Sequence, residues 1–379
     1  MASGNIVERV RKSGKKCFEI TVEGERDPLT GKRNRIYKTV KCSEKEAKAI
    51  MRRMMTEMEQ NKIIKKNHKT VTEWLEEWIN LYLPNIEETT RVGYKTKINC
   101  YIVNSIGDIQ ICSLRTEHVQ RMVNDMLAKG LSPKSIRDTF IIVKAAMKKA
   151  VVLRMIPYNP CEGVELPKLK KYKANVYDQD MIHTVLETAY GTDMYLPVLL
   201  GALLGLRRGE MLALRWDNID FKTNTIHIRS NMVRGENNFI IKAPKSEAGI
   251  RDLRVGDEVL VELKKARTQY MTDALSYDGI FQNLNFVIRQ EDGSPLCPDS
   301  MTRKWSRFLK DNNLPHIRLH DLRHSHATAL IQAGVNPRVV QQRLGHSDVN
   351  ITLNTYTHVL PEMDMEAAIK LDALMLKKA

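Results

Sequence analysis

The sequence lacks several features that would place it in common classes of protein. No apolar run reaches the roughly 18 residues that a membrane-spanning helix needs. The N-terminal segment MASGNIVERVRKSGKK has no apolar stretch of the kind found in secretory signals. Low-complexity segments and internal repeats are also absent. We therefore expect a chain without membrane segments that folds into two or three domains over its 379 residues.

Paired cysteines are also missing. The six cysteines are scattered without a CxxC pair, at positions 17, 42, 100, 112, 161 and 297. Such spacing is typical of reduced thiols and does not indicate a disulfide framework or a zinc site. We therefore expect a reducing, cytoplasmic environment and no structural metal.

Basic charge is concentrated in the first part of the chain. Residues 1–66 contain 18 basic and 9 acidic residues, and residues 67–174 contain 17 and 11. Residues 175–379 contain 25 of each, so the whole excess of +15 lies upstream of them. Such segregation favours binding of nucleic acid by the upstream part over a general effect on solubility, and leaves another task to the neutral part.

The first 66 residues predict a small sheet followed by a helix. Phe18, Ile20 and Val22 alternate as in a strand, and further strand residues follow a turn. Ser43 and Glu46 have capping-box spacing and open a helix that runs to about residue 66. A DNA-binding module and a solvated appendage explain this composition equally well.

Residues 67–156 predict a small helical domain. Thr70 and Glu73 form a second capping box, and the helix that follows ends before Pro84. Its two tryptophans fit core positions better than base-stacking positions. Another helix is expected over about 117–129.

The last helix of this region begins at Pro133 and has two faces. Its apolar face contains Ile136, Phe140, Val143, Met147 and Val151. Arg137, Lys144 and Lys148 lie a quarter-turn or more away and form a basic face. That face fits contact with DNA phosphates and ordinary exposure to solvent equally well.

Prolines and a basic run mark residues 157–174 as an exposed linker. Beyond it the pattern predicts a mixed α/β domain. Strands are expected near 226–228, 239–241 and 250–255, and helices over about 178–203, 208–214, 256–274, 299–312, 320–333, 337–344 and 361–377. The expected fold is thus mainly α with small β elements: a small N-terminal sheet plus helix, a helical domain, and a mixed α/β domain.

Five residues of this last domain have the chemistry of phosphoryl transfer. Arg207 lies between two helical segments, and His320 and Arg323 share one face of a helix. His346 follows the expected end of a helix, and Tyr356 lies ten residues later. Arginine forks bind phosphate oxygens bidentately and stabilise transition-state charge, and a tyrosine hydroxyl can then serve as the nucleophile.

The segments around these residues resemble the signature blocks of the tyrosine recombinases, or phage-type integrases. The blocks are GLRRGEMLALRWDNID at 205–220, LHDLRHSHATALIQAG at 319–334 and LGHSDVNITLNTYTHV at 344–359. The segment DPLTGKRNRIYKTVKCSEKEA at 27–47 is similar to the arm-DNA-binding domain of integrases from conjugative transposons. The resemblance therefore extends over nearly the whole chain.

The resemblance implies three domains: an arm-binding domain at 1–66, a core-binding domain at 67–156, and a catalytic domain with a tail helix at 175–379. Basic residues of the first two are expected to contact DNA. They are Lys32, Arg33 and Arg35 in the arm-binding domain, and Arg137, Lys144 and Lys148 in the core-binding domain.

The resemblance also implies a role for each of the five residues. Tyr356 matches the nucleophile, and Arg207, His320, Arg323 and His346 match the residues that act on the scissile phosphate. In this family the tyrosine forms a 3′-phosphotyrosine and releases a 5′-hydroxyl. The bond energy stays in that link, so the family chemistry needs neither ATP, nor a metal ion, nor another cofactor.

The family has, in addition, a lysine on a β-hairpin that acts as general acid. Lys245 in the segment Ala-Pro-Lys-Ser fits this position, and Lys242 is the nearby alternative. The chain departs from the family at Leu204, where threonine often precedes Gly-Leu-Arg. That difference should affect packing and leave the chemistry unchanged.

The other histidines of these blocks, His324, His326 and His358, are expected to be structural. A metal cluster of His320, His324 and Glu210 is an alternative reading of the same region. No HExxH or CxxC motif supports it, so we expect no metal site.

The expected function is site-specific DNA recombination, with integration and excision of a mobile element. Four protomers would act as a homotetramer on DNA, through a Holliday junction. The expected partners are double-stranded DNA at core and arm sites, and an excisionase or a host DNA-bending protein. The nearest alternative is a nicking and closing enzyme like the type IB topoisomerases, and the other is a non-catalytic DNA-binding protein of the same fold.

A terminal helix is expected over residues 361–377. Pro361 suits its start, acidic residues fill its first turns, and lysines fill its last turn. Ala368, Leu371, Leu374 and Met375 form an apolar stripe that must be buried. We expect this stripe to dock on a neighbouring protomer, and packing on its own catalytic domain is the alternative.

Overall fold

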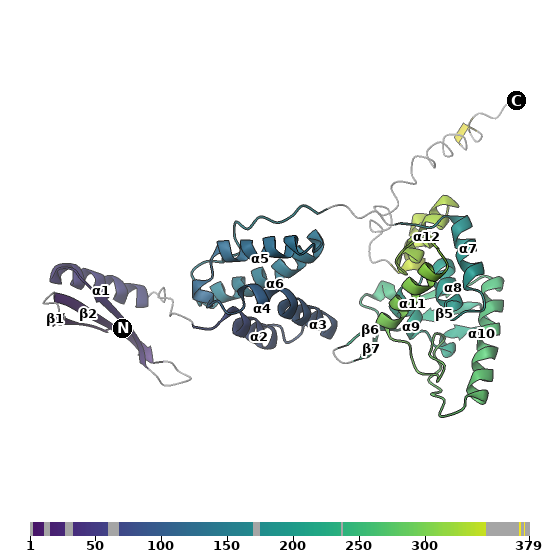
Figure 1. Ribbon diagram of the computed structural model, residues 1–379, viewed down its shortest axis with the longest axis horizontal. Coiled ribbons are helices and arrows are strands. Elements are labelled where there is room, and N and C mark those ends of the chain that lie inside the picture. The colour runs from purple at the N-terminus through teal and green to yellow at the C-terminus, as the bar shows by residue number, and fades with distance from the viewer. Residues whose placement is uncertain are drawn as a thin grey trace. The chain divides into compact units, whose positions relative to one another are not determined.

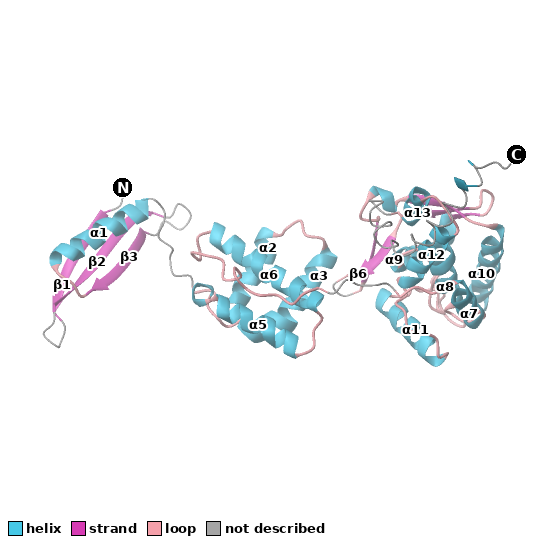
Figure 2. Cartoon of the chain, turned by 90° about the horizontal axis from the view of Figure 1, so that it is seen from above, coloured by secondary structure: helices cyan, strands magenta, loops and turns pink. Residues whose placement is uncertain are grey.

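The computed structural model describes residues 3–10, 16–26, 33–59, 68–169, 175–235 and 238–345, and the single positions 371, 372 and 375. The chain divides into two compact units, Met1–Ile86 with Tyr94–Leu169, and Glu87–Gly93 with Lys170–Ala379. Among the described helices, none is long and apolar enough to cross a membrane. Figures 1 and 2 show elements that are mostly helical, with small sheets.

The first unit begins with an antiparallel sheet of three strands in the order β1-β2-β3. The strands are β1 (Ser3–Val10), β2 (Lys16–Arg26) and β3 (Arg33–Val40), and helix α1 (Glu44–Glu59) covers one face (Figure 2). Phe18, Ile20 and Val22 are buried in the same cluster as methionines of α1. The predicted capping box is confirmed, because the Ser43 amide donates to Glu46 Oε2 at 2.9 Å.

The same unit continues as a helical bundle. Its elements are α2 (Val71–Tyr82), the last part of α3 (Glu88–Lys97), a π-helical turn (Ile98–Ile102), α4 (Val103–Ile106), α5 (Thr116–Ala128) and α6 (Pro133–Val152). The first residues of α3, up to Gly93, group with the second unit. The capping box at Thr70 and the N-cap at Ser132 confirm the predicted helix starts. Trp74 is fully buried and its Nε1 donates to the Ala146 carbonyl at 3.0 Å, so it belongs to the core as expected.

Apart from the start of α3, the second unit contains seven α-helices, two short 3₁₀ turns and five short strands within its described residues. The helices are α7 (Gln179–Ala189), α8 (Tyr195–Leu204), α9 (Arg208–Ala213), α10 (Asp257–Ser276), α11 (Pro298–Asp311), α12 (Asp321–Gln332) and α13 (Pro337–Leu344). Strands β4 (Ile219–Asp220), β5 (Thr225–Ile228) and β8 (Arg251–Arg254) form one sheet, and β6 (Asn231–Arg234) and β7 (Phe239–Lys242) form a hairpin.

One prediction of secondary structure is wrong, and one helical stretch was not predicted. The single helix expected over 178–203 is two helices, because the chain turns between α7 and α8 at Gly191, whose φ is +74°. The sequence pattern gave no assignment between Pro84 and residue 117, where α3, the π-helical turn and α4 occupy Glu88–Ile106. A π-helical turn adds a residue to one helical turn, and this insertion shifts the apolar period.

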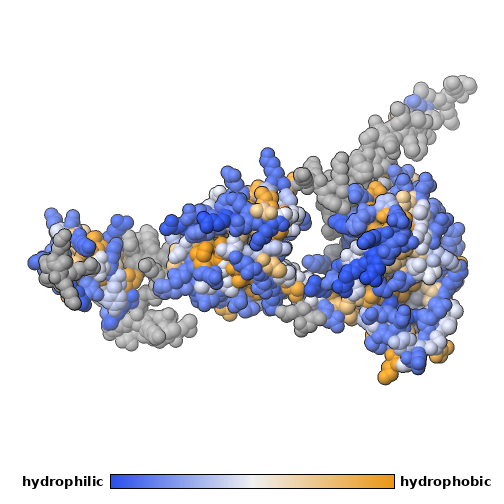
Figure 3. Space-filling view, viewed as in Figure 1, coloured by the Kyte–Doolittle hydropathy of each residue, from blue (hydrophilic) through white to orange (hydrophobic). Residues whose placement is uncertain are grey.

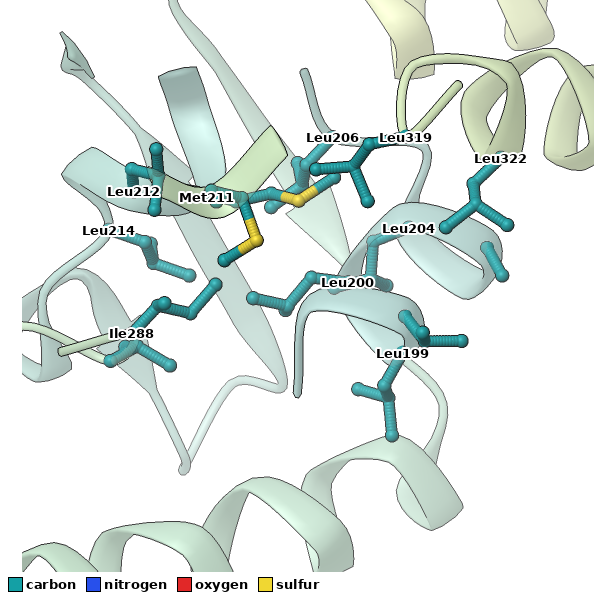
Figure 4. Packing of buried hydrophobic residues seen from close by; sticks show 14 of the residues in the cluster. Leu199, Leu200, Leu204, Leu206, Met211, Leu212, Leu214, Ile288, Leu319 and Leu322 are labelled. Atoms are coloured by element: carbon teal, nitrogen blue, oxygen red, sulfur yellow. The ribbon is translucent and has the colours of Figure 1, made fainter. Parts of the chain in front are cut away.

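The core of the second unit lies directly beneath the segment that contains Arg207. Leu206 and Met211, on either side of Arg207, pack into the same cluster as Leu200, Leu204 and Leu322 (Figure 4). Helices α8, α9 and α12 are thereby held together by apolar contacts. The viewed surface is mostly hydrophilic, with apolar residues in separate spots (Figure 3).

Several predicted features lie outside the described residues. They are Lys32, His346, Tyr356, His358 and the predicted start of the tail helix at Pro361. The predicted extension of the α1 helix to about residue 66 also lies outside them.

Candidate active site

Arg207 is held at the N-terminal end of helix α9. Gly205 ends helix α8 with a φ of +64°, and a Cβ at this position would lie 2.6 Å from the His326 ring. Leu206 is then buried in the core, so the next side chain, Arg207, emerges at the surface of the helix junction. Arg207 Nη1 donates to Glu210 Oε1 at 2.7 Å, and the Arg207 amide donates to Glu210 Oε2 at 3.0 Å.

Arg323 is the second arginine of the site, and it is almost completely buried on helix α12, with 1% exposure. Its Nη1 donates to the Gly205 carbonyl at 2.7 Å, and its Nη2 donates to the Leu344 carbonyl at 2.6 Å. Arg323 therefore connects the α8–α9 junction to the C-terminal end of α13.

Arg207 reaches the same end of α13, because its Nη2 donates to the Gly345 carbonyl at 2.8 Å. The two arginines thus bind consecutive carbonyls, those of Leu344 and Gly345. The C-terminal end of a helix presents unpaired carbonyls with partial negative charge, which explains the attraction. Two of the three signature blocks meet at the third, one residue before His346 in the chain.

A buried carboxylate and a third arginine support this arrangement. The sequence indicated Glu210 only as a member of the alternative metal cluster, and it did not indicate Arg251. Glu210 is 2% exposed, and Arg251 on β8 donates to it through Nη1 at 3.2 Å and Nη2 at 2.9 Å. Burial acts to raise the pKa of Glu210, but the hydrogen bonds and charge of Arg251, together with Arg207, hold it below its ordinary value. The available signal was a glutamate among apolar residues, at N3 of the helix that Arg207 caps.

His320 lies at the start of α12, close to Arg207. Burial of its ring lowers the pKa of His320 to about 4, although part of the residue stays exposed, and His324, Arg323 and Arg207 act in the same direction. The His320 and His324 rings lie 5.1 Å apart and nearly perpendicular. At neutral pH the His320 imidazole is therefore uncharged and can donate one N–H without adding charge.

The two candidate lysines lie at the end of the β6–β7 hairpin. Lys242 is the last residue of β7 and is half-buried, and Lys245 is exposed in the turn that follows. Strand β6 of this hairpin packs on α9, which connects it to the helix that Arg207 caps. The position of Lys245 in an exposed turn suits a group that must reach a bound DNA strand.

The predicted DNA-contacting residues have different environments. Lys144 and Lys148 are exposed on α6, whereas Arg137 is half-buried and its Nε donates to the Pro167 carbonyl at 2.9 Å. Arg35 is exposed on β3 and pairs with Glu23. Arg33 is the first residue of β3, where only its backbone is described.

The described residues do not form a candidate metal site. Within the described ranges, no three His, Cys, Asp or Glu residues are grouped so that they could hold a metal ion. His326 is buried and its Nδ1 donates to the Ala202 carbonyl at 3.0 Å, which is a structural contact between α12 and α8.

Comparison with known proteins identifies the family. Residues 178–363 match the phage integrase family, and residues 70–127 match the N-terminal SAM-like domain of phage integrases. The chain belongs to the phage integrase family. This integrase is 27% identical over 364 residues to the ICEBs1 integrase of Bacillus subtilis (strain 168), a match that covers 94% of the chain and 97% of the relative.

Solved structures show the same fold. The Tn1549 transposon integrase in complex with a circular intermediate DNA has a TM-score of 0.67 and 21% identity, and the match covers 78% of this chain and 99% of that one. A lambda integrase tetramer bound to a Holliday junction has a TM-score of 0.59 and 17% identity, with 92% and 94% covered. The predicted fold class is confirmed, and the integrase is a tyrosine site-specific recombinase that acts on DNA, close to conjugative transposon integrases.

Proposed function

We propose that this recombinase integrates and excises a mobile element, with Tyr356 as its nucleophile. The observation that carries this proposal is the convergence of Arg207 and Arg323 on the carbonyls of Leu344 and Gly345, directly before His346. A phosphate oxygen bound at this junction would meet the same two guanidinium groups, which bind phosphate more strongly than a neutral carbonyl.

In the proposed reaction the Tyr356 hydroxyl gives its proton to water, and its oxygen attacks the scissile phosphorus. The bond to the 5′ oxygen breaks, and Lys245 supplies the proton that this oxygen takes up. Arg207 and Arg323 stabilise the charge of the transition state, and His320, whose imidazole is uncharged, and His346 donate hydrogen bonds to the phosphate. The 5′-hydroxyl of the partner strand then attacks the 3′-phosphotyrosine, forms a new phosphodiester and releases Tyr356, which takes up the proton that the hydroxyl loses. One phosphoester bond replaces another, so the step requires no external energy source.

The lambda integrase tetramer on a Holliday junction supports a homotetramer as the active assembly. Arm and core sites on double-stranded DNA would be bound by residues 1–66 and 67–156, through Lys32, Arg33 and Arg35 and through Arg137, Lys144 and Lys148. An excisionase or a host DNA-bending protein would set the direction of the reaction.

The experiment uses nicked DNA that contains the end of the element, so that cleavage traps the enzyme covalently. The wild-type protein should give a covalent band on a denaturing gel, also in excess chelator. Tyr356→Phe should bind the site equally and give no band. An adduct formed by Tyr356→Phe contradicts the assignment, and relaxation of supercoiled DNA without strand exchange between duplexes would favour the topoisomerase alternative.

A further inference from the structure

We propose that Arg251 is a positioning residue of this recombinase. It aligns Arg207, the turn after Lys245 and the end of α13, which directly precedes His346. The proposal rests on the function proposed above. It concerns a residue that lies outside the three signature blocks and that does not contact the DNA strand itself.

The contacts of Arg251 extend to three elements. Its Nη2 and Nη1 donate to Glu210 on α9, at 2.9 and 3.2 Å. Nη1 also donates to the Gly249 carbonyl at 3.1 Å, and Nε donates to the Arg343 carbonyl at 2.7 Å. One planar group therefore holds α9, the 3₁₀ turn Glu247–Gly249 and the last turn of α13 at fixed distances.

The packing around this fork leaves little freedom. The Arg251 side chain is 6% exposed and that of Glu210 is 2% exposed. A Cβ at Gly345 would lie 2.6 Å from the Ala248 carbonyl oxygen and 3.0 Å from Arg251 Nη1. The end of α13 is thus pressed against the turn that follows Lys245, with Arg251 between them.

Arg251 also determines the charge of Glu210. The cations that face the Glu210 carboxylate are Arg207 from α9 and Arg251 from β8, and the charged Arg343 of α13 lies beside Arg251. Without Arg251, the buried Glu210 carboxylate would keep only Arg207 as an ion partner against the effect of burial, which raises its pKa. Its pKa would then rise, and a protonated Glu210 would no longer hold Arg207 by an ion pair.

These contacts predict a pH signature. The test measures single-turnover covalent adduct formation on nicked DNA at saturating protein, between pH 5 and 8, with site binding measured in parallel. Arg251→Met should cleave at least tenfold more slowly than the wild type at pH 6, and its rate should rise with pH along an acid limb that the wild type lacks. The double variant Arg251→Met, Glu210→Gln should be slow at every pH and lack this limb.

Two further variants separate positioning from stability. Arg289 is a matched control in the same unit, because its side chain is 13% exposed and pairs with Asp273 away from the site. Arg289→Met should keep the wild-type pH profile. Arg251→Lys keeps a charge beside Glu210 but cannot span Gly249 and Arg343, so it should be about tenfold slow without an acid limb, with normal site binding.

The proposal is overturned if the profile of Arg251→Met parallels that of the wild type, or if the double variant keeps the acid limb. If Arg251→Met does not melt cooperatively, the cleavage rate of Arg251→Lys becomes the test. A wild-type rate for Arg251→Lys then overturns the proposal. Failure of the proposed function has a different result, namely a wild-type protein without adduct or an adduct in Tyr356→Phe.

Discussion

At the scale of single residues, Arg207 depends on the shape of its guanidinium. One end donates to Glu210 and the other to the Gly345 carbonyl, and a lysine ammonium cannot span the two. We expect Arg207→Lys to bind DNA normally and to cleave roughly 10²–10³ times more slowly, which corresponds to about 3–4 kcal/mol of barrier. Single-turnover cleavage on nicked DNA measures this.

The neighbouring Arg208 offers a matched control. It donates to the Pro298 carbonyl and to Thr302 Oγ1 on α11, away from the arginine cluster. Arg208→Lys should cleave within a small factor of the wild-type rate. A wild-type rate for Arg207→Lys, or an equal loss in both variants, would contradict the proposed clamp.

The burial of His326 leads to a second prediction, which concerns the stability of the folded protein against acid. Burial lowers the pKa of His326 to about 4 from an ordinary 6.5. The unfolded chain therefore binds a proton at higher pH than the folded one, and stability present at neutral pH is lost as the pH falls below about 6.5. At pH 5 this loss amounts to about 2 kcal/mol.

The variant His326→Asn removes this titration. Its free energy of unfolding should change less between pH 7 and pH 5 than that of the wild type, by about 2 kcal/mol, in denaturant titrations at the two values. His316→Asn is the control, since His316 is exposed, and it should keep the wild-type dependence. Equal pH dependence in His326→Asn and the wild type would refute the assignment.

The sequence was sufficient to predict that Arg207 and Arg323 belong to one site, but it did not predict the residues that support them. The spacing of short motifs identifies side chains whose chemistry is recognisable on its own. Glu210 and Arg251 lie 41 positions apart, and their pairing depends on how β8 packs beside α9. No local pattern contains that information, so the network became visible only in three dimensions.

At the scale of elements, helix starts were predictable and helix interruptions were not. The capping boxes at Ser43 and Thr70 and the proline at Pro133 are local signals, and each marks the start of a helix. The break at Gly191 is made by a left-handed glycine that lies between two apolar stretches of helical period, and the π-helical turn at Ile98–Ile102 has no recognisable local signal. Strand β6 was missed for a related reason, since its four residues acquire a partner only in the hairpin.

Gly209 couples two elements of the site and leads to a third prediction. A Cβ at Gly209 would lie within 3 Å of Asn231 Oδ1 and the Met232 carbonyl oxygen, both on β6. An alanine must therefore displace the β6–β7 hairpin, which precedes Lys245. General acid catalysis contributes a factor of about 10²–10⁴ to the rate. Gly209→Ala should therefore lose a measurable part of this factor, which single-turnover cleavage detects.

The test compares two DNA substrates. A sulfur in place of the bridging 5′ oxygen makes a leaving group that needs no proton, so Gly209→Ala should recover most of its lost rate on that DNA. Gly256→Ala is the matched control, because a Cβ there would meet nothing within 4 Å. Equal loss on both substrates would show that the alanine disturbs Arg207 and not the lysine turn.

At the scale of the whole molecule, the distribution of charge predicts that chemistry and DNA affinity lie in different parts of the chain. The residues from 175 onward contain the arginine cluster and have a hydrophobic core of their own, yet their net charge is zero. Residues 1–66 and 67–174 contribute +9 and +6.

This division predicts how binding responds to salt. Each phosphate that the protein neutralises adds about 0.9 to the slope of log affinity against log salt concentration. The full chain should therefore show a much steeper slope than residues 175–379 alone. Fluorescence anisotropy on one DNA duplex, from roughly 50 to 300 mM salt, measures both slopes. A chain of residues 68–379 is the intermediate case, and its slope should lie between the two because it keeps the charge of residues 68–174. If all three proteins gave the same slope, the upstream charge would serve solubility, and the neutral catalytic part would have to supply the DNA affinity through the cations of its own surface.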